Sequence, residues 1–172
     1  IGIERLHAVL RDVAGQAVSA AGLDDAEVAT IRAGMGIAGI SRPGMREQLA
    51  ALPFPFAAIE FVTDAAIANL GAHAGVEGAT LIIGTGSVAE VRVGTNSFTI
   101  GGYGFPISDE GSGAALGLSA MRHALRALDG RSEVTPLSHA VTAGFGHDTA
   151  RAVAWMDAAT PKDYAAFAPL VM

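Results

Sequence analysis

The sequence predicts an α/β fold, and three features of its 172 residues indicate this class. Short apolar runs of strand length alternate with segments whose apolar residues recur at helical spacing, which is typical of layered α/β domains. The hydrophobic fraction of 51% is enough for a buried core, whereas aromatic residues make up only 6% of the chain. Aliphatic residues and glycine must therefore fill the interior, which suits close packing of helices on a sheet.

The first 75 residues are expected to form helices and two buried strands. An apolar stripe at helical spacing starts at Ile3, tolerates Gly15 as a weak point and ends before Gly22, a typical C-cap. Ser41 is expected to cap a later helix that carries Pro43 in its first turn. The expected helices of this half are 3–21, 24–31, 41–52 and 65–73, and the expected strands are 33–40 and 57–63.

The second half is expected to begin with strands and to continue as helices. A hairpin should turn at Gly94-Thr95-Asn96, and a long helix should begin at Glu110 or Gly111 and stop before Asp129. Because the pattern changes after a loop of turn composition at residues 75–78, we expect two units, 1–76 and 77–172. The expected strands are 79–83, 88–93 and 98–100, and the expected helices are 110–128, 136–143, 148–156 and 161 onward.

Composition excludes several classes of function. A net charge of −6 without basic runs is a poor match to a nucleic-acid partner. No apolar run approaches a membrane span, and the absence of cysteine excludes disulfides and thiolate metal sites, so we expect a cytoplasmic protein without a membrane partner. The five histidines are dispersed, and none is assigned as a metal ligand.

Residues 84–113 carry the strongest functional signal. They contain eight glycines, which are entropically costly in ordered structure and therefore indicate close backbone approach to a phosphate or a sugar. The turn Gly84-Thr85-Gly86-Ser87 can expose backbone N–H groups and hydroxyls to an anion, or it can be an ordinary hairpin turn. It is not a Walker loop, because no Gly-Lys-Ser/Thr follows.

Two further motifs lie in the same stretch. In Gly101-Gly102-Tyr103-Gly104 the glycines permit positive φ, and Tyr103 can pack on a sugar or fill the core of an irregular loop. In Asp109-Glu110-Gly111-Ser112-Gly113 the carboxylate of Asp109 can accept hydrogen bonds from substrate hydroxyls beside a helix N-terminus that can meet an anion. The alternative is that Asp109 and Glu110 only cap the helix and complement its dipole.

Asp64 is the candidate general base. It follows the expected strand 57–63, and ligands bind at the carboxyl ends of strands in open α/β sheets. A carboxylate there can accept the proton of a hydroxyl nucleophile. The alternative is a helix N-cap, because Thr63-Asp64 precedes an expected helix.

These motifs, in this order, resemble the N-acetylglucosamine kinase and glucosamine kinase group of the BadF/BadG/BcrA/BcrD-type ATPase family. The family lies within the sugar kinase, Hsp70 and actin superfamily, and the resemblance spans residues of about 30–130. It implies a ribonuclease-H-like, actin-like ATPase fold, with parts of two α/β domains around a cleft. Residues 1–76 would be the later part of the first domain and 77–172 the early part of the second, so the chain is expected to be an internal portion.

The resemblance also implies roles for the motif residues. Asp64 matches the catalytic base and contacts the sugar, and the turn Gly84, Thr85, Gly86 and Ser87 matches a phosphate-binding turn for ATP. The sugar-contact loop matches Gly101, Gly102, Tyr103 and Gly104, and Asp109 matches a ligand of a sugar hydroxyl. Tyr103 stands where the sugar kinases often have Trp, and Ser108 where they often have Gly.

The expected function is ATP-dependent phosphorylation of N-acetylglucosamine or glucosamine, at the 6-hydroxyl, with Mg²⁺ on the phosphates. The Mg²⁺ ligands and the first phosphate loop would lie outside these residues, so the isolated segment is expected to be inactive. An activator-type regulatory ATPase without a sugar substrate is the alternative, although that branch uses cysteine ligands that this chain lacks. A homodimer is left open.

Overall fold

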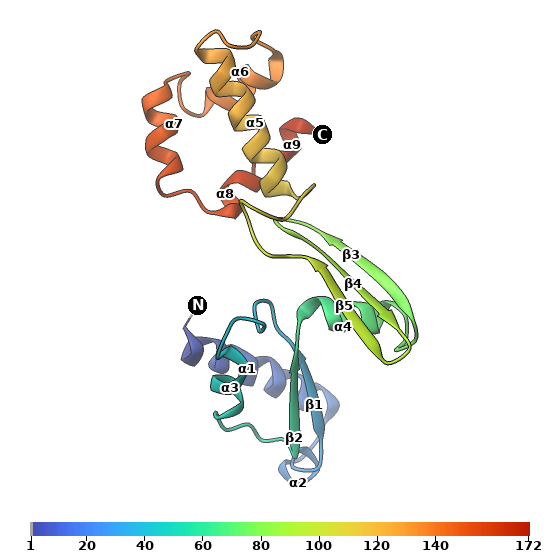
Figure 1. The fold of residues 1–172 in the computed structure, drawn as a ribbon. Coiled ribbons are helices and arrows are strands. Elements are labelled where there is room, and N and C mark those ends of the chain that lie inside the picture. The colour runs from blue at the N-terminus through green and yellow to red at the C-terminus, as the bar shows by residue number, and fades with distance from the viewer. Residues whose placement is uncertain (1) are drawn as a thin grey trace. The chain divides into compact units, whose positions relative to one another are not determined.

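The computed structural model describes residues 2–172, which divide into two compact units, one ending at Gly75 and the other beginning at Val76 (Figure 1). The first unit contains a two-stranded parallel sheet of β1 (Arg32–Gly36) and β2 (Ala58–Val62). Its helices are α1 (Ile3–Ala21), α2 (Asp25–Val28), α3 (Met45–Ala50) and α4 (Asp64–Ala72). Strands and helices therefore alternate as predicted.

The core of the first unit lies between this sheet and the helices α1 and α3. Leu49 of α3 is fully buried, and Phe61 of β2 packs in the same cluster, against which Leu10 of α1 also lies. Helix α4 packs on β1, where a side chain at Gly36 would overlap Ile67. The apolar stripe of α1 thus packs on the core of this unit, as its helical spacing predicts.

Two predicted boundaries in this unit are wrong. Strand β1 ends at Gly36 rather than at residue 40, because the chain turns at Gly39, whose φ of +79° belongs to the left-handed region. Ser41 does not cap α3; successive turns carry the chain to Gly44, the N-cap, and the helix begins at Met45. Gly15 does not interrupt α1, which runs unbroken to its left-handed C-cap, Gly22.

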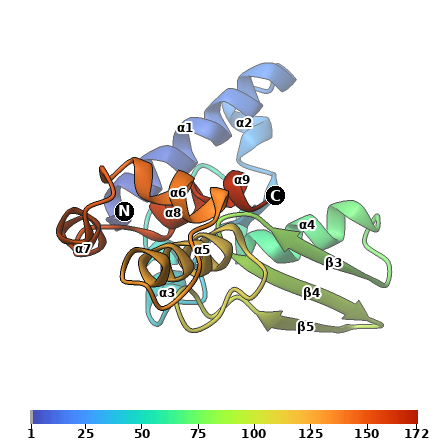
Figure 2. The ribbon, with the colours of Figure 1, turned by 90° about the horizontal axis from the view of Figure 1, so that it is seen from above.

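The second unit contains an antiparallel sheet in the order β3–β4–β5, with the helices α5–α9 gathered at one end of it (Figures 1 and 2). The strands are β3 (Gly78–Ile83), β4 (Ser87–Val93) and β5 (Asn96–Gly101). The predicted hairpin joins β4 to β5, where Val93 pairs with Asn96. The helices are α5 (Gly113–Leu128), α6 (Pro136–Ala143), α7 (Thr149–Met156), α8 (Pro161–Ala165) and α9 (Ala168–Val171).

The two faces of this sheet differ in polarity. Register places Leu81, Ala89 and Ile100 side by side on one face, and Leu81 and Ile100 are 64% and 60% exposed. On the other face Glu90 is buried and accepts hydrogen bonds from Ser97 Oγ at 2.7 Å and Thr99 Oγ1 at 2.8 Å. The sheet therefore carries an apolar face open to solvent and a polar face with a buried acid.

The helices α6, α8 and α9 pack around α5. A side chain at Gly117 would overlap the carbonyl oxygen of Tyr164, so α8 lies directly against α5 at this glycine. Ala120, Ala124 and Val141 form the buried centre between α5 and α6. Trp155 is 5.5 Å from Phe145 and 5.6 Å from Phe167 between ring centroids, which ties α7 to this core. No helix among residues 2–172 is long and apolar enough to cross a membrane.

Candidate functional site

The turn Gly84–Gly86 is a hairpin turn that joins β3 to β4. The amide of Gly84 donates to the carbonyl oxygen of Gly86 at 2.8 Å. The same turn is bound to the start of α5, because Gly113 N–H donates to Gly84 O at 2.8 Å and Ala114 N–H donates to Thr85 O at 3.1 Å. The backbone of Gly84–Gly86 is therefore a hairpin turn, as one of the two predicted alternatives had it. Its hydrogen bonds to Gly113 and Ala114 hold it against α5.

These contacts change what the N-terminus of α5 can do. The N–H groups of Gly113 and Ala114 are engaged by the turn, and the N–H of Ala115 donates to Ser112 Oγ at 3.1 Å. The first amides of a helix bind an anion only when no other acceptor takes them. The expectation that this N-terminus meets an anion is therefore wrong, since its donors are already paired within the protein.

Asp109 is not the cap of α5. The N-cap is Ser112, which is fully buried, and the helix begins at Gly113 rather than at Glu110 or Gly111. Asp109 adopts a left-handed conformation with φ of +68°, as Gly111 does with +74°, and such backbone cannot continue into a helix. The capping alternative for Asp109 is thus wrong.

The carboxylate of Asp109 lies beside the turn. A Cβ on Gly86 would come within 2.9 Å of Asp109 Oδ2, so any other residue here would have to displace the carboxylate. Asp109 is 8% exposed, and within the described residues no hydrogen bond or ion pair engages its carboxylate. No buried side-chain oxygen among the described residues lacks a partner, so the carboxylate oxygens of Asp109 reach solvent and are open to hydrogen bonds from a ligand.

The glycine loop after β5 approaches the same turn. Gly101 and Gly102 both have φ of +72°, and a Cβ on Gly102 would come within 2.8 Å of Val88 Cγ2. Gly104 also has positive φ. Tyr103 is 82% exposed, so the alternative that it fills the core is wrong. Ser87 Oγ donates to Glu110 O at 2.9 Å and links the turn to the far end of this loop.

Asp64 lies in the first unit, at the carboxyl end of β2. The alternative helix start at Thr63-Asp64 is confirmed, although the N-cap is Thr63, whose Oγ1 accepts from Ala66 N–H at 3.0 Å, and not Asp64. Asp64 is the first residue of α4, where a negative charge complements the helix dipole. Its side chain is exposed, and no hydrogen bond or ion pair within the described residues engages it. The carboxylate is therefore free for chemistry.

The structure thus brings together the second-unit residues of the predicted site. Gly86 lies against Asp109, Ser87 binds Glu110, and Gly102 lies against Val88. Two contributors were not found from the sequence. Ser112 carries an ordinary N-cap signal and could have been recognised by it. Phe105 packs on Tyr164 with ring centroids 5.0 Å apart, a pairing distant in sequence that has no local signal.

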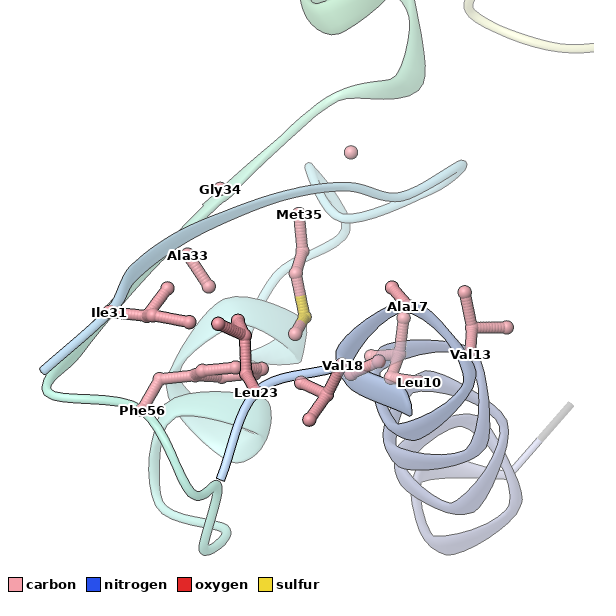
Figure 3. A pocket seen from close by; sticks show the side chains of 12 residues that line it. Leu10, Val13, Ala17, Val18, Leu23, Ile31, Ala33, Gly34, Met35 and Phe56 are labelled. Carbon is pink, nitrogen blue, oxygen red and sulfur yellow. The ribbon is translucent and has the colours of Figure 1, made fainter. Parts of the chain in front are cut away.

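A separate pocket of about 430 Å³ lies in the first unit between α1 and β1. Figure 3 shows Met35 extending from the strand toward Leu10 and Val18 of the helix. No titratable side chain lines the pocket, so it offers no group to bind phosphate or activate a hydroxyl. Among residues 2–172 no group of three or more acidic, histidine or cysteine side chains is arranged to hold a metal ion.

Comparison with known proteins places the chain in a family. The sequence model of the BadF/BadG/BcrA/BcrD ATPase family matches residues 1–172, so the chain belongs to this family of ATPases. A glucosamine kinase of Vibrio cholerae is 38% identical over 171 residues, which cover 99% of this chain and 58% of that protein. An N-acetylmuramic acid/N-acetylglucosamine kinase of Clostridium acetobutylicum is 43% identical over 77 residues, 44% of this chain and 25% of that protein.

A solved structure has the same fold. A protein of Chromobacterium violaceum described as an N-acetylglucosamine kinase superposes with a TM-score of 0.85 at 35% identity, covering 99% of this chain and 60% of its own length. The predicted α/β, actin-like ATPase fold and the predicted family are therefore confirmed. The chain spans about three fifths of the length of these first relatives.

Proposed function

We propose that the protein containing this chain transfers a phosphoryl group from ATP to an amino sugar, glucosamine or N-acetylglucosamine, at the 6-hydroxyl. The observation that supports this most directly is the carboxylate of Asp109. Asp109 is 8% exposed as a residue, but its carboxylate oxygens reach solvent, engage no hydrogen-bond partner within residues 2–172 and lie against Gly86 of the hairpin turn. A site built to bind sugar hydroxyls needs such an acceptor, because each hydroxyl donates one strong hydrogen bond to a carboxylate.

The residues divide between the two substrates. The turn Gly84–Ser87 would hold phosphate oxygens of ATP, with the exposed hydroxyl of Thr85 as an additional donor. The loop Gly101–Gly104 would lie against the sugar, with Tyr103 offering an aromatic face, and Asp109 would accept from a sugar hydroxyl. In this proposal the units are the later part of a first ribonuclease-H-like domain and the early part of a second.

Asp64 would be the general base. Its exposed carboxylate at the end of β2 would accept the proton of the attacking hydroxyl. Mg²⁺ would neutralise charge on the phosphates, and its protein ligands are not among the residues assigned here. The remaining catalytic contribution is positioning of the hydroxyl in line with the transferred phosphoryl group.

The test uses the full-length protein. Purified enzyme is given ATP and Mg²⁺ with glucosamine, N-acetylglucosamine or N-acetylmuramate, and ADP release is followed while NMR of the product locates the phosphate. We expect sugar-dependent ADP release and a 6-phosphate. ADP release that is independent of sugar would instead indicate an ATPase of the regulatory type and would overturn the proposal.

The Asp64→Asn variant tests the base. We expect it to lower kcat by at least ~100-fold, since general base catalysis contributes about that much. Glu60→Gln is the matched control, because Glu60 is an exposed acid on β2, four residues before Asp64, and has no proposed role. Wild-type turnover in Asp64→Asn, or an equal loss in Glu60→Gln, would contradict the assignment of Asp64.

A further inference from the structure

Phe105 lies in the middle of the loop that joins β5 to α5. Phe105 is half-buried, whereas the next residue, Pro106, is exposed and Ile107 is 88% exposed, so Phe105 is the side chain that this part of the loop directs inward. The ring packs on Tyr164 of α8, with centroids 5.0 Å apart and planes tilted by 40°. The loop after β5 is thereby joined to the helices at the end of the sheet (Figure 1).

Tyr164 is itself firmly held. It is 6% exposed, and its backbone lies against α5 at Gly117, where no side chain would fit. The ring of Trp155 packs on the ring of Tyr164, with centroids 4.9 Å apart. Because interiors packed in this way resist deformation, Tyr164 is a fixed platform for the ring of Phe105.

The two ends of the loop are also fixed. Gly101 pairs with Val88 in the sheet, and the carbonyl of Glu110 accepts from Ser87 Oγ. Between these points the chain makes an internal hydrogen bond from Ser108 N–H to Gly104 O at 3.0 Å. Tyr103 lies two residues before Phe105 and Asp109 four residues after it, so both belong to the segment that these contacts tether.

We propose that the Phe105–Tyr164 contact positions the sugar-binding loop, and that α8 thereby sets the affinity for the sugar. Phe105 is a positioning residue, since it acts through Tyr103 and Asp109 and not on a reacting atom. This inference rests on the proposed function, which assigns the loop to the sugar. It extends that function to a helix that carries none of the motif residues.

Three variants of the full-length protein test the contact. Phe105→Ala removes the loop's ring. Tyr164→Phe keeps the platform ring and removes only a hydroxyl that has no hydrogen-bond partner within the described residues, so the hydrogen exchange of the loop should stay at the wild-type rate. Phe145→Leu is the matched control, because it removes a ring from the same cluster that contacts Trp155 and Phe167 but not the loop.

Two measurements decide the outcome. Amide hydrogen exchange is measured by mass spectrometry, and KM is measured separately for sugar and for ATP. In Phe105→Ala we expect faster exchange confined to residues 101–112 and a sugar KM raised about three- to tenfold, the range that an aromatic pair supports. The ATP KM should stay within about twofold, because Gly84 and Thr85 of the turn are held by the amides of α5 and not by Phe105.

The results separate the inference from the function on which it rests. If the wild type phosphorylates no amino sugar, the proposed function fails, and the exchange of residues 101–112 still decides whether Phe105 anchors the loop. If the wild type is active and Phe105→Ala retains both wild-type loop exchange and wild-type sugar KM, the inference is overturned. An equal rise of sugar KM in Phe145→Leu would also overturn it, because the effect would then be general loosening of the cluster.

Discussion

Replacing Gly117 by alanine tests the packing of α8 on α5. A Cβ at this position would lie 2.5 Å from the carbonyl carbon of Tyr164 and 3.3 Å from its Cα, and would overlap the carbonyl oxygen. All three atoms belong to the backbone, so no side-chain rotation can relieve the clash. Helix α8 must move away from α5 and loosen its packing.

The size of the effect follows from two opposing terms. Alanine in a helix interior is favoured over glycine by about 1 kcal/mol. Overpacking a well-packed site costs about 1–3 kcal/mol. A clash that can be relieved only by moving the backbone is expected to cost an amount in the upper part of that range. We therefore expect Gly117→Ala to lower the free energy of unfolding by about 1–2 kcal/mol.

Gly15→Ala supplies a control of the opposite sign. Gly15 lies inside α1, and a Cβ there would meet no atom within 4 Å. The propensity term then acts alone, and the variant should be more stable by about 0.5–1 kcal/mol. The two variants make the same chemical change in two helices and differ only in their surroundings.

Urea denaturation of the full-length protein measures both variants, by far-UV circular dichroism and by tryptophan fluorescence. Trp155 lies 4.9 Å from the ring of Tyr164, so its contribution to the emission reports on the region around α8. Unchanged or increased stability of Gly117→Ala would refute the packing argument, because the propensity gain would then be unopposed.

Two further predictions concern carboxylates of the second unit. Asp109→Asn should lower kcat/KM for the sugar by about 10- to 100-fold, because the charged acceptor of the sugar hydroxyl is lost. Asparagine tolerates the left-handed backbone of this position, so the loop should keep its conformation. A kcat/KM equal to that of the wild type in steady-state assays would contradict the prediction. The hydroxyl and amide of Thr160 donate to Asp163 and hold the pKa of its carboxyl below the usual 3.8, so the stabilisation is present above pH 3.8 and is lost as the pH falls through the lowered pKa. Acid titration followed by fluorescence should therefore show a flatter pH dependence for Asp163→Asn below pH 3.8, and an unchanged acid profile would contradict the prediction.

The sequence predicted the elements whose signals are local. The apolar stripe of α1 and its Gly22 cap were predicted correctly, as was the hairpin between β4 and β5. The errors occur where backbone conformation decides: Gly39 ends β1 early, and the left-handed Asp109 delays the start of α5. Aspartate is common both at helix N-caps and in the left-handed conformation, so the sequence alone does not show which of the two Asp109 adopts.

The candidate site was predictable to the extent that motifs carried it. The glycine turns and Asp109 were named from the sequence, and the structure adds that Gly86 admits the Asp109 carboxylate. The paired amides at the start of α5 could not be foreseen, because they depend on the docking of a hairpin turn from earlier in the chain. The contact of Phe105 with Tyr164 likewise arises from tertiary packing alone.

The apolar face of the β3–β5 sheet has a practical consequence. Leu81, Ile83, Phe98 and Ile100 are each more than half exposed on it, and they form a contiguous water-facing surface of aliphatic and aromatic groups. Such surfaces drive self-association and bind hydrophobic dyes. A recombinant preparation limited to these 172 residues should therefore scatter light at high concentration, and charged replacements at Leu81 or Ile100 should improve its yield as a dispersed sample.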